Sequence, residues 1–115
     1  MADLLVDTDV FVDHLRGHTV FGPGRNRVHV SVITRAELLA GTSASNVITE
    51  LLSPYRELPI DRAVAERAGR VRRETGIRLP DALIAATALE HRLSLVTRND
   101  LDFGRIRGLR RRQLP

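Results

Sequence analysis

The sequence predicts an α/β domain of three layers, with helices packed on both faces of a mainly parallel sheet. Short apolar runs alternate along the chain with longer segments of helical periodicity. Parallel strands need such helical crossovers between them, which favours this fold class over an antiparallel one. The 115 residues suffice for one hydrophobic core and not for two, so we expect one domain over residues 1–115.

The N-terminal elements are expected to be a strand and a helix. Residues 4–6 are an apolar run typical of a buried strand, and Asp7 directly after it can cap a helix. This helix should extend to about Leu15 and end at Gly17. Three glycines and a proline in residues 17–27 predict a loop.

A second strand is expected at residues 28–30, followed by two helices. Ser31 or Thr34 can cap the first of these helices, and Gly41 is a candidate for its C-cap. The second is indicated by an apolar stripe at helical spacing. The stripe consists of Val47, Ile48, Leu51 and Leu52.

The C-terminal half predicts two further helices and a third strand. Asp61 is the expected N-cap of a helix that ends at Gly76, and Asp81 lies at the start of a helix rich in Ala and Leu. The strand is expected at residues 93–97. A turn at 98–104 and a short arginine-rich tail complete the chain.

Composition excludes several kinds of chemistry. The chain has no cysteine and no lysine, which excludes disulfides, thiol or amine nucleophiles and thiolate metal sites. All eighteen basic residues are therefore arginine, and the net charge is +4. Arginine suits phosphate oxygens, so a polyanionic partner is one explanation, and genome composition is the other. A signal peptide and a membrane span are both absent, so we expect a cytoplasmic protein without a membrane partner.

Acidic residues occur where the predicted strands end. Asp7 follows the first strand, Glu37 lies on the helix after the second, and Asp100 and Asp102 follow the third. Asp81 begins the apolar helix. Each acid alone could be a helix cap, but ligand sites in such sheets form beyond the carboxyl ends of the strands. Converging carboxylates need a cation, and hard oxygen ligands favour Mg²⁺ or Mn²⁺.

Four segments in series resemble the PIN-domain ribonucleases, and in particular the VapC-type toxins of bacterial VapBC toxin–antitoxin pairs. They are LLVDTDVFV at 4–12, SVITRAELLAG at 31–41, LPDALIAATA at 79–88 and LVTRNDLDF at 95–103. The first segment is weak by itself, whereas the four in family order span almost the whole chain. The resemblance implies a three-layer α/β/α PIN-like fold with a mainly parallel central sheet.

The resemblance also implies the roles of the acids. Asp7, Glu37 and Asp81 match the family's metal-binding acids directly. Asp102 is the favoured fourth acid, and Asp100 is the alternative. Four polar residues are expected to support the site, namely Thr8, Asp9, Thr97 and Asn99.

The implied activity is metal-dependent hydrolysis of RNA by a water molecule, with one or two Mg²⁺ ions and no covalent intermediate. Arginines near the last acids could hold the RNA backbone, although solvated surface charge explains them too. They are Arg98, Arg105, Arg107, Arg110, Arg111 and Arg112. The arginines of the helix after Asp61 are instead expected to lie in solvent, where Glu66 and Glu74 can pair with Arg62 or Arg70.

The resemblance further implies a cognate antitoxin that blocks the site, a homodimer or larger toxin–antitoxin assembly, and an RNA substrate, with transfer RNA favoured. Two other functions stay open. One is a non-catalytic, arginine-rich domain that binds RNA or protein and uses its acids as caps. The other is a phosphatase of the haloacid-dehalogenase type, suggested by Asp7 and Asp9 after a strand, although that family needs a lysine.

Overall fold

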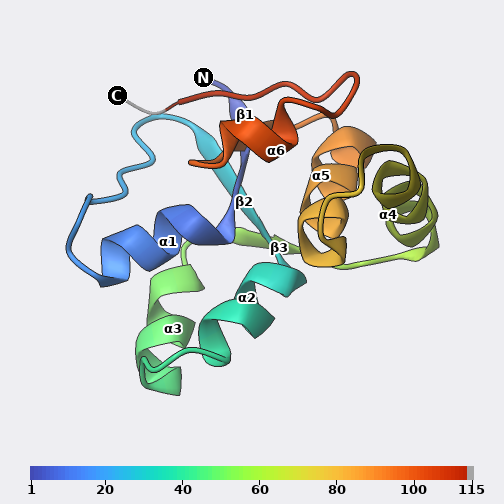
Figure 1. Ribbon diagram of the computed structural model, residues 1–115. Helices are drawn as coiled ribbons and strands as arrows, with labels where there is room; N and C mark the ends of the chain where they lie inside the picture. Colours follow the sequence, from blue (N-terminus) through green and yellow to red (C-terminus); the bar gives the residue numbers. More distant parts are fainter. Residues whose placement is uncertain (114–115) are drawn as a thin grey trace.

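A sheet of four parallel strands lies at the centre of the computed structural model, which describes residues 1–113 (Figure 1). Residues 114 and 115, the last two of the predicted domain, lie outside the described part. The strands are β1 (Asp3–Val6), β2 (Arg27–Ser31), β3 (Arg56–Leu58) and β4 (Ser94–Val96). Their order in the sheet is β3-β2-β1-β4. All three neighbouring pairs are parallel, as expected from the alternation of strands and helices.

Helices cover both faces of this sheet, which confirms the three-layer α/β prediction (Figure 1). Helices α1 (Thr8–Leu15), α2 (Val32–Leu39) and α3 (Ser45–Leu52) lie on one side. Helices α4 (Arg62–Thr75) and α5 (Leu79–His91) lie on the other, and a single helical turn, α6 (Asp100–Phe103), follows β4. No helix in residues 1–113 combines the length and the apolar character needed to cross a membrane.

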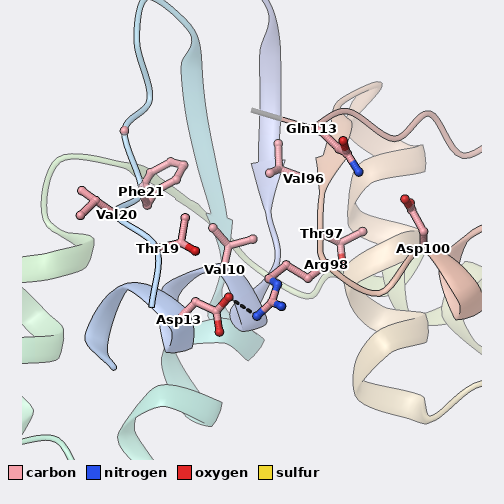
Figure 2. Close-up of a pocket in the computed structure, with 11 residues that line it drawn as sticks. Val10, Asp13, Thr19, Val20, Phe21, Val96, Thr97, Arg98, Asp100 and Gln113 are labelled. Atoms are coloured by element: carbon pink, nitrogen blue, oxygen red, sulfur yellow. Dashed lines mark hydrogen bonds and ion pairs between the residues drawn. The ribbon is translucent and has the colours of Figure 1, made fainter. Parts of the chain in front are cut away.

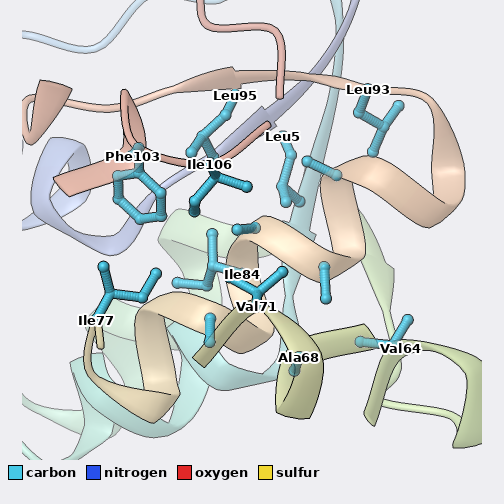
Figure 3. Close-up of a cluster of buried hydrophobic side chains, with 14 of the residues drawn as sticks. Leu5, Val64, Ala68, Val71, Ile77, Ile84, Leu93, Leu95, Phe103 and Ile106 are labelled. Atoms are coloured by element: carbon cyan, nitrogen blue, oxygen red, sulfur yellow. The ribbon is translucent and has the colours of Figure 1, made fainter. Parts of the chain in front are cut away.

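Strand β1 divides the apolar core into two halves. Its side chains alternate, so that Leu5 packs with the α4–α5 half while Leu4 and Val6 pack with the α1–α3 half. Phe103 of α6 belongs to the first half, beside Leu95 of β4 (Figure 3). The packing of Phe103 therefore holds the turn after β4 against the end of the sheet.

Helix α5 is the most buried helix, as its run of Ala and Leu predicts. Alanine side chains allow the helix to pack closely against both α4 and the sheet. Six of its residues are buried, namely Ala82, Ile84, Ala85, Ala86, Thr87 and Ala88. Its N-terminus follows Gly76, whose φ of 74° is the left-handed conformation that ends α4. The close packing of α4 against α5 fixes the position of the first turn of α5, and with it the position of Asp81.

The connections place a ligand site between β1 and β4. From β1 the chain moves outward through β2 to β3, and then crosses back through α4 and α5 to β4 on the opposite side of β1. The helices that follow β1 and β4 therefore diverge to opposite faces. Such a reversal of strand order leaves a crevice at the carboxyl ends of the two strands.

Several local predictions were wrong. Strand β3 was not predicted because it has three residues, and two of them, Arg56 and Glu57, are exposed at the sheet edge. The expected turn at 98–104 contains the helical turn α6. The C-cap of α2 is Ala40 in the right-handed conformation and not Gly41, whereas its N-cap is Ser31, one of the two predicted candidates.

The arginine-rich tail is also better ordered than the sequence suggests. Leu95 of β4 donates a backbone hydrogen bond to Arg110, and Arg112 donates one to Leu95. These bonds attach the tail to the free edge of β4. Backbone pairing of this kind depends on an available sheet edge and has no signature in the tail itself.

Candidate active site

Asp7 lies at the centre of the crevice between β1 and β4. Its backbone amide donates to the carbonyl oxygen of Val96, and its Oδ1 accepts from the amide of Thr8, which makes it the N-cap of α1. Only 4% of the residue is exposed. This burial and the negative charge of Asp9 raise the pKa of Asp7 to about 7, while hydrogen bonds from Thr97 and Thr8 oppose the rise.

Thr97 connects Asp7 to a second carboxylate. Its Oγ1 donates to Asp7 Oδ2 at 2.8 Å and lies 3.3 Å from Asp9 Oδ2, while it accepts from the amide of Asn99. Asp9 also accepts from the backbone amide of Arg98. Burial raises the pKa of Asp9, although these hydrogen bonds and the charge of Arg98 lower it. Both carboxylates are thus attached to the residues that follow β4.

Glu37 reaches the same region from α2. Thr8 Oγ1 donates to Glu37 Oε1 at 2.7 Å and shares a second hydrogen bond with Thr34 Oγ1 at 2.9 Å. Since the Thr8 proton is used for Glu37, Thr34 is the donor in the second bond. Thr34 is fully buried, so this chain of hydroxyl groups fixes Glu37 beside the start of α1.

Asp81 enters from the opposite side of the sheet, in the first turn of α5. Burial is the main reason that its pKa is raised, and the nearby Arg78 partly reverses the effect. The charges of Glu37, Asp102 and Asp9 raise the pKa further. The pKa of Asp81 is therefore affected by the negative charges of carboxylates from α2, α6 and α1.

The last two acids lie in different surroundings. Asp102 accepts a hydrogen bond from Asn99 Nδ2 at 2.9 Å, and its own amide donates to Asn99 Oδ1. Asp100 instead pairs with Arg111 at 2.9 Å, and 52% of its side chain is exposed. Its charge is not among the main causes that shift the pKa of Asp7, Asp9 or Asp81. The structure thus places Asp102 with the other acids and Asp100 outside them.

Gly104, the C-cap of α6, allows the chain to pass close to the carbonyl oxygen of Asp100 at the end of this helical turn. A Cβ atom at Gly104 would lie 2.6 Å from the carbonyl oxygen of Asp100, closer than such atoms approach. A side chain here would therefore force the α6 turn to move, and Asp102 with it.

Five carboxylates consequently converge at one end of the sheet, from Asp7, Asp9, Glu37, Asp81 and Asp102. As a donor set they fit a hard divalent cation such as Mg²⁺ or Mn²⁺. Within residues 1–113, however, no three acidic or histidine side chains are close enough to share an ion in their present orientations. Four of the five are held by hydroxyl or amide groups of the chain, so a shared ion requires side-chain rotation toward it.

A pocket of about 340 Å³ lies beside these acids, between α1, the loop at 19–22 and the end of β4 (Figure 2). Arg98 crosses its lower part and forms an ion pair with Asp13, a buried carboxylate one turn after Asp9. Asp100 borders the pocket on the β4 side (Figure 2). The pocket places a positive side chain next to the acidic cluster.

The predicted RNA-binding arginines are spread over several positions. Arg98 and Arg111 are engaged in ion pairs, Arg110 donates to the carbonyl oxygen of Arg92, and Arg105 donates to that of Thr75. They do not form one patch. The ion pairs expected between Arg62 or Arg70 and the glutamates of α4 are absent from residues 1–113, where α4 instead pairs Arg67 with Glu90 of α5.

Three residues of this site were not found from the sequence. Thr34 holds Glu37 indirectly, because its hydroxyl is bonded to that of Thr8, which donates to Glu37. The charge of Arg78 lowers the pKa of Asp81. Asp13 fixes the side chain of Arg98. The position of Asp13 one helical turn after Asp9 was a usable signal, whereas the partners of Thr34 and Arg78 depend on packing between distant segments.

Comparison with known proteins assigns this arrangement to a family. The PIN domain family model matches residues 4–109. Ribonuclease VapC10 of Mycobacterium tuberculosis is 37% identical over 113 residues, and the match covers 87% of this chain and 85% of that protein.

Solved structures show the same fold. A chain of a toxin–antitoxin complex from Klebsiella pneumoniae has a TM-score of 0.77 and 30% identity, covering 96% of this chain and 99% of that one. VapBC2 from Rickettsia felis, bound to a promoter DNA fragment, has a TM-score of 0.82 at 22% identity, covering 98% and 99%. Because its identity is only 22%, the likeness to VapBC2 supports the fold alone.

Proposed function

Because the chain belongs to the PIN-domain family, and within it to the VapC type, we propose that it is an endoribonuclease that acts as a toxin. The observation that carries this proposal is the convergence of carboxylates at one end of the sheet, from Asp7 directly after β1 and from α1, α2, α5 and α6. A helix cap needs one carboxylate. Five carboxylates from segments on both faces of the sheet repel one another unless a cation lies among them. A domain that only binds RNA or protein does not require such a cluster.

We propose Asp7, Glu37, Asp81 and Asp102 as the residues that hold Mg²⁺ or Mn²⁺. When bound, such an ion supplies a water of lowered pKa and neutralises negative charge that develops on the phosphate. Asp9 and Asn99 then act as positioning residues, since Asp9 shares the Thr97 hydroxyl with Asp7 and Asn99 holds Asp102. Asp100 is not included, because Arg111 engages it.

The chain's other residues orient these acids. The hydroxyl groups of Thr97 and Thr8 donate protons to Asp7 and Glu37, so they serve as fixed donors and not as nucleophiles. With no cysteine or lysine in the chain, direct attack by water is the simplest route to hydrolysis. Arg98 and Arg78 flank the acids and could neutralise phosphate oxygens of a bound RNA.

Metal-dependent cleavage tests this function. The purified protein is expected to cut RNA in Mg²⁺ or Mn²⁺ and to stop when EDTA is added, because the acids alone cannot activate water. Transfer, ribosomal and messenger RNA are compared side by side by gel electrophoresis, and we propose transfer RNA as the preferred substrate. Equal cleavage in EDTA, or RNA binding without cleavage in either metal, would leave a binding domain as the better description.

The solved relative from Klebsiella pneumoniae is a toxin–antitoxin complex, which supports a cognate antitoxin for this chain. We propose that the antitoxin covers the acidic end of the sheet, that the toxin forms a homodimer or larger assembly with it, and that both act in the cytoplasm. Expression of this chain alone is expected to arrest growth, and co-expression of the neighbouring open reading frame to restore it. Normal growth at the same protein level would contradict the toxin assignment.

A further inference from the structure

A second groove, rich in arginine, lies on the α4–α5 side of the sheet. It has a volume of about 580 Å³ and an apolar floor that includes Val71 and Ile106. Four arginines line it, Arg67 and Arg70 from α4 and Arg105 and Arg107 from the segment after α6. We call this feature the arginine groove. Its two walls are more than thirty residues apart in the sequence, so only the fold brings them together.

The positive charge of the arginine groove is only partly neutralised. Arg67 pairs with Glu90 at 3.2 Å, and Glu74 is the one acid on the lining. When the charges of the four arginines and these two glutamates are added, the arginine groove has a net charge of +2. Arg70 and Arg107 have no ion-pair or side-chain hydrogen-bond partner within residues 1–113. Arg67 Nε, moreover, is the one buried side-chain nitrogen there without a hydrogen bond.

Arg105 connects the arginine groove to the acidic site. Its backbone amide donates to the carbonyl oxygen of Asp102 at 3.2 Å, and its guanidinium donates to the carbonyl oxygen of Thr75 at the end of α4. The side chain is therefore held across the gap between α6 and α4. Arg105 therefore links the segment that carries Asp102 to the lining of the arginine groove.

From this arrangement we propose that the arginine groove binds the phosphate backbone of the RNA substrate on one side of the cleavage point. This inference rests on the function proposed above. The planar fork of arginine binds phosphate oxygens in pairs, and unpaired arginines carry no cost of breaking an ion pair first. No aromatic residue lines the groove to stack on a base. Recognition there is consequently directed at the backbone and independent of sequence.

The double variant R70Q/R107Q tests the proposal, with R73Q as the matched control. Arg73 lies on the same helix and is exposed, but it does not line the groove. Binding of a labelled single-stranded RNA is measured by fluorescence anisotropy in EDTA, so that no cleavage is needed. Loss of two phosphate contacts is expected to weaken binding roughly tenfold and to reduce the slope of log K against log salt by about 1.4. R73Q should bind like the unaltered protein.

A tetranucleotide that covers only the acidic site serves as the second ligand. Its binding should be weakened less than that of the long RNA. Equal effects on both ligands, or equal effects of R70Q/R107Q and R73Q, would overturn the proposal. So would a change of molecular mass in light scattering for R70Q/R107Q, because the groove would then be an interface between copies. Absence of cleavage in Mg²⁺ would count against the ribonuclease function and not against the groove.

Discussion

Replacement of Asp81 by Asn is expected to lower the rate of metal-dependent RNA cleavage by roughly 10²- to 10³-fold. Asp81 is the acid on which the charges of Glu37, Asp102 and Asp9 all act, and it approaches the site from the opposite face of the sheet. Asn has the same shape but provides one neutral oxygen, so the contribution to charge neutralisation is lost. The rate is measured on a labelled RNA at saturating Mg²⁺.

Asp100→Asn is the matched control for this substitution. Asp100 is an aspartate in the same stretch of acidic residues as Asp102, yet it is exposed and pairs with Arg111. An exposed pair contributes little to stability, so D100N should fold normally and keep most of its activity. A large loss in D100N together with a small loss in D102N would reverse the assignment of the fourth acid. Unchanged activity in D81N would refute the proposed metal site itself.

Replacement of Asp7 by Asn is expected to change how stability depends on pH. Burial holds the pKa of Asp7 at about 7 in the folded chain, against an ordinary value of 3.8. The folded state therefore binds a proton more tightly than the unfolded state. In the metal-free protein, the stability due to this proton is fully present below pH 3.8 and is lost as the pH rises to about 7.

The size of this effect is large for a domain of this length. The rise from 3.8 to about 7 corresponds to about 4 kcal/mol in the free energy of unfolding. Asn cannot ionise, and its one side-chain oxygen can still accept the hydrogen bond from the Thr8 amide. The Thr97 hydroxyl, which donates to the other oxygen of Asp7, can donate to Asp9 instead. D7N should therefore be more stable than the unaltered protein at pH 8 in EDTA, and the difference should shrink toward pH 4.

Urea unfolding at a series of pH values between 4 and 8 measures this difference. Added Mg²⁺ should stabilise the unaltered protein at pH 8, because an ion that binds only the folded state shifts the equilibrium. D7N should respond less to Mg²⁺. Parallel pH profiles of the two proteins would show that Asp7 is ionised in the metal-free fold, and an equal response to Mg²⁺ would exclude Asp7 as a ligand.

Much of the fold could be predicted because its signals are local. The apolar runs at β1, β2 and β4, the caps Asp7 and Asp61, and the alanine-rich α5 are patterns of a few residues. Strand β3 could not be predicted, since three residues with two exposed charges have no pattern. The tail bound to β4 could not be predicted either, because the hydrogen bonds involve the backbone, which is the same for every residue type.

The candidate site also has features that could be predicted from the sequence and features that could not. By itself the sequence determined which acids follow strands or begin helices, and hence that Asp7, Glu37 and Asp81 are candidates for one edge of a sheet. Only the tertiary structure decided that Asp102 lies among them and Asp100 outside, because the charge of Asp102 acts on Asp81 of α5 whereas Asp100, two residues earlier, pairs with Arg111. Periodicity places a side chain on an element, whereas the packing of distant elements decides what it meets. For the same reason only the structure shows that two of the α4 arginines, Arg67 and Arg70, line one groove with Arg105 and Arg107.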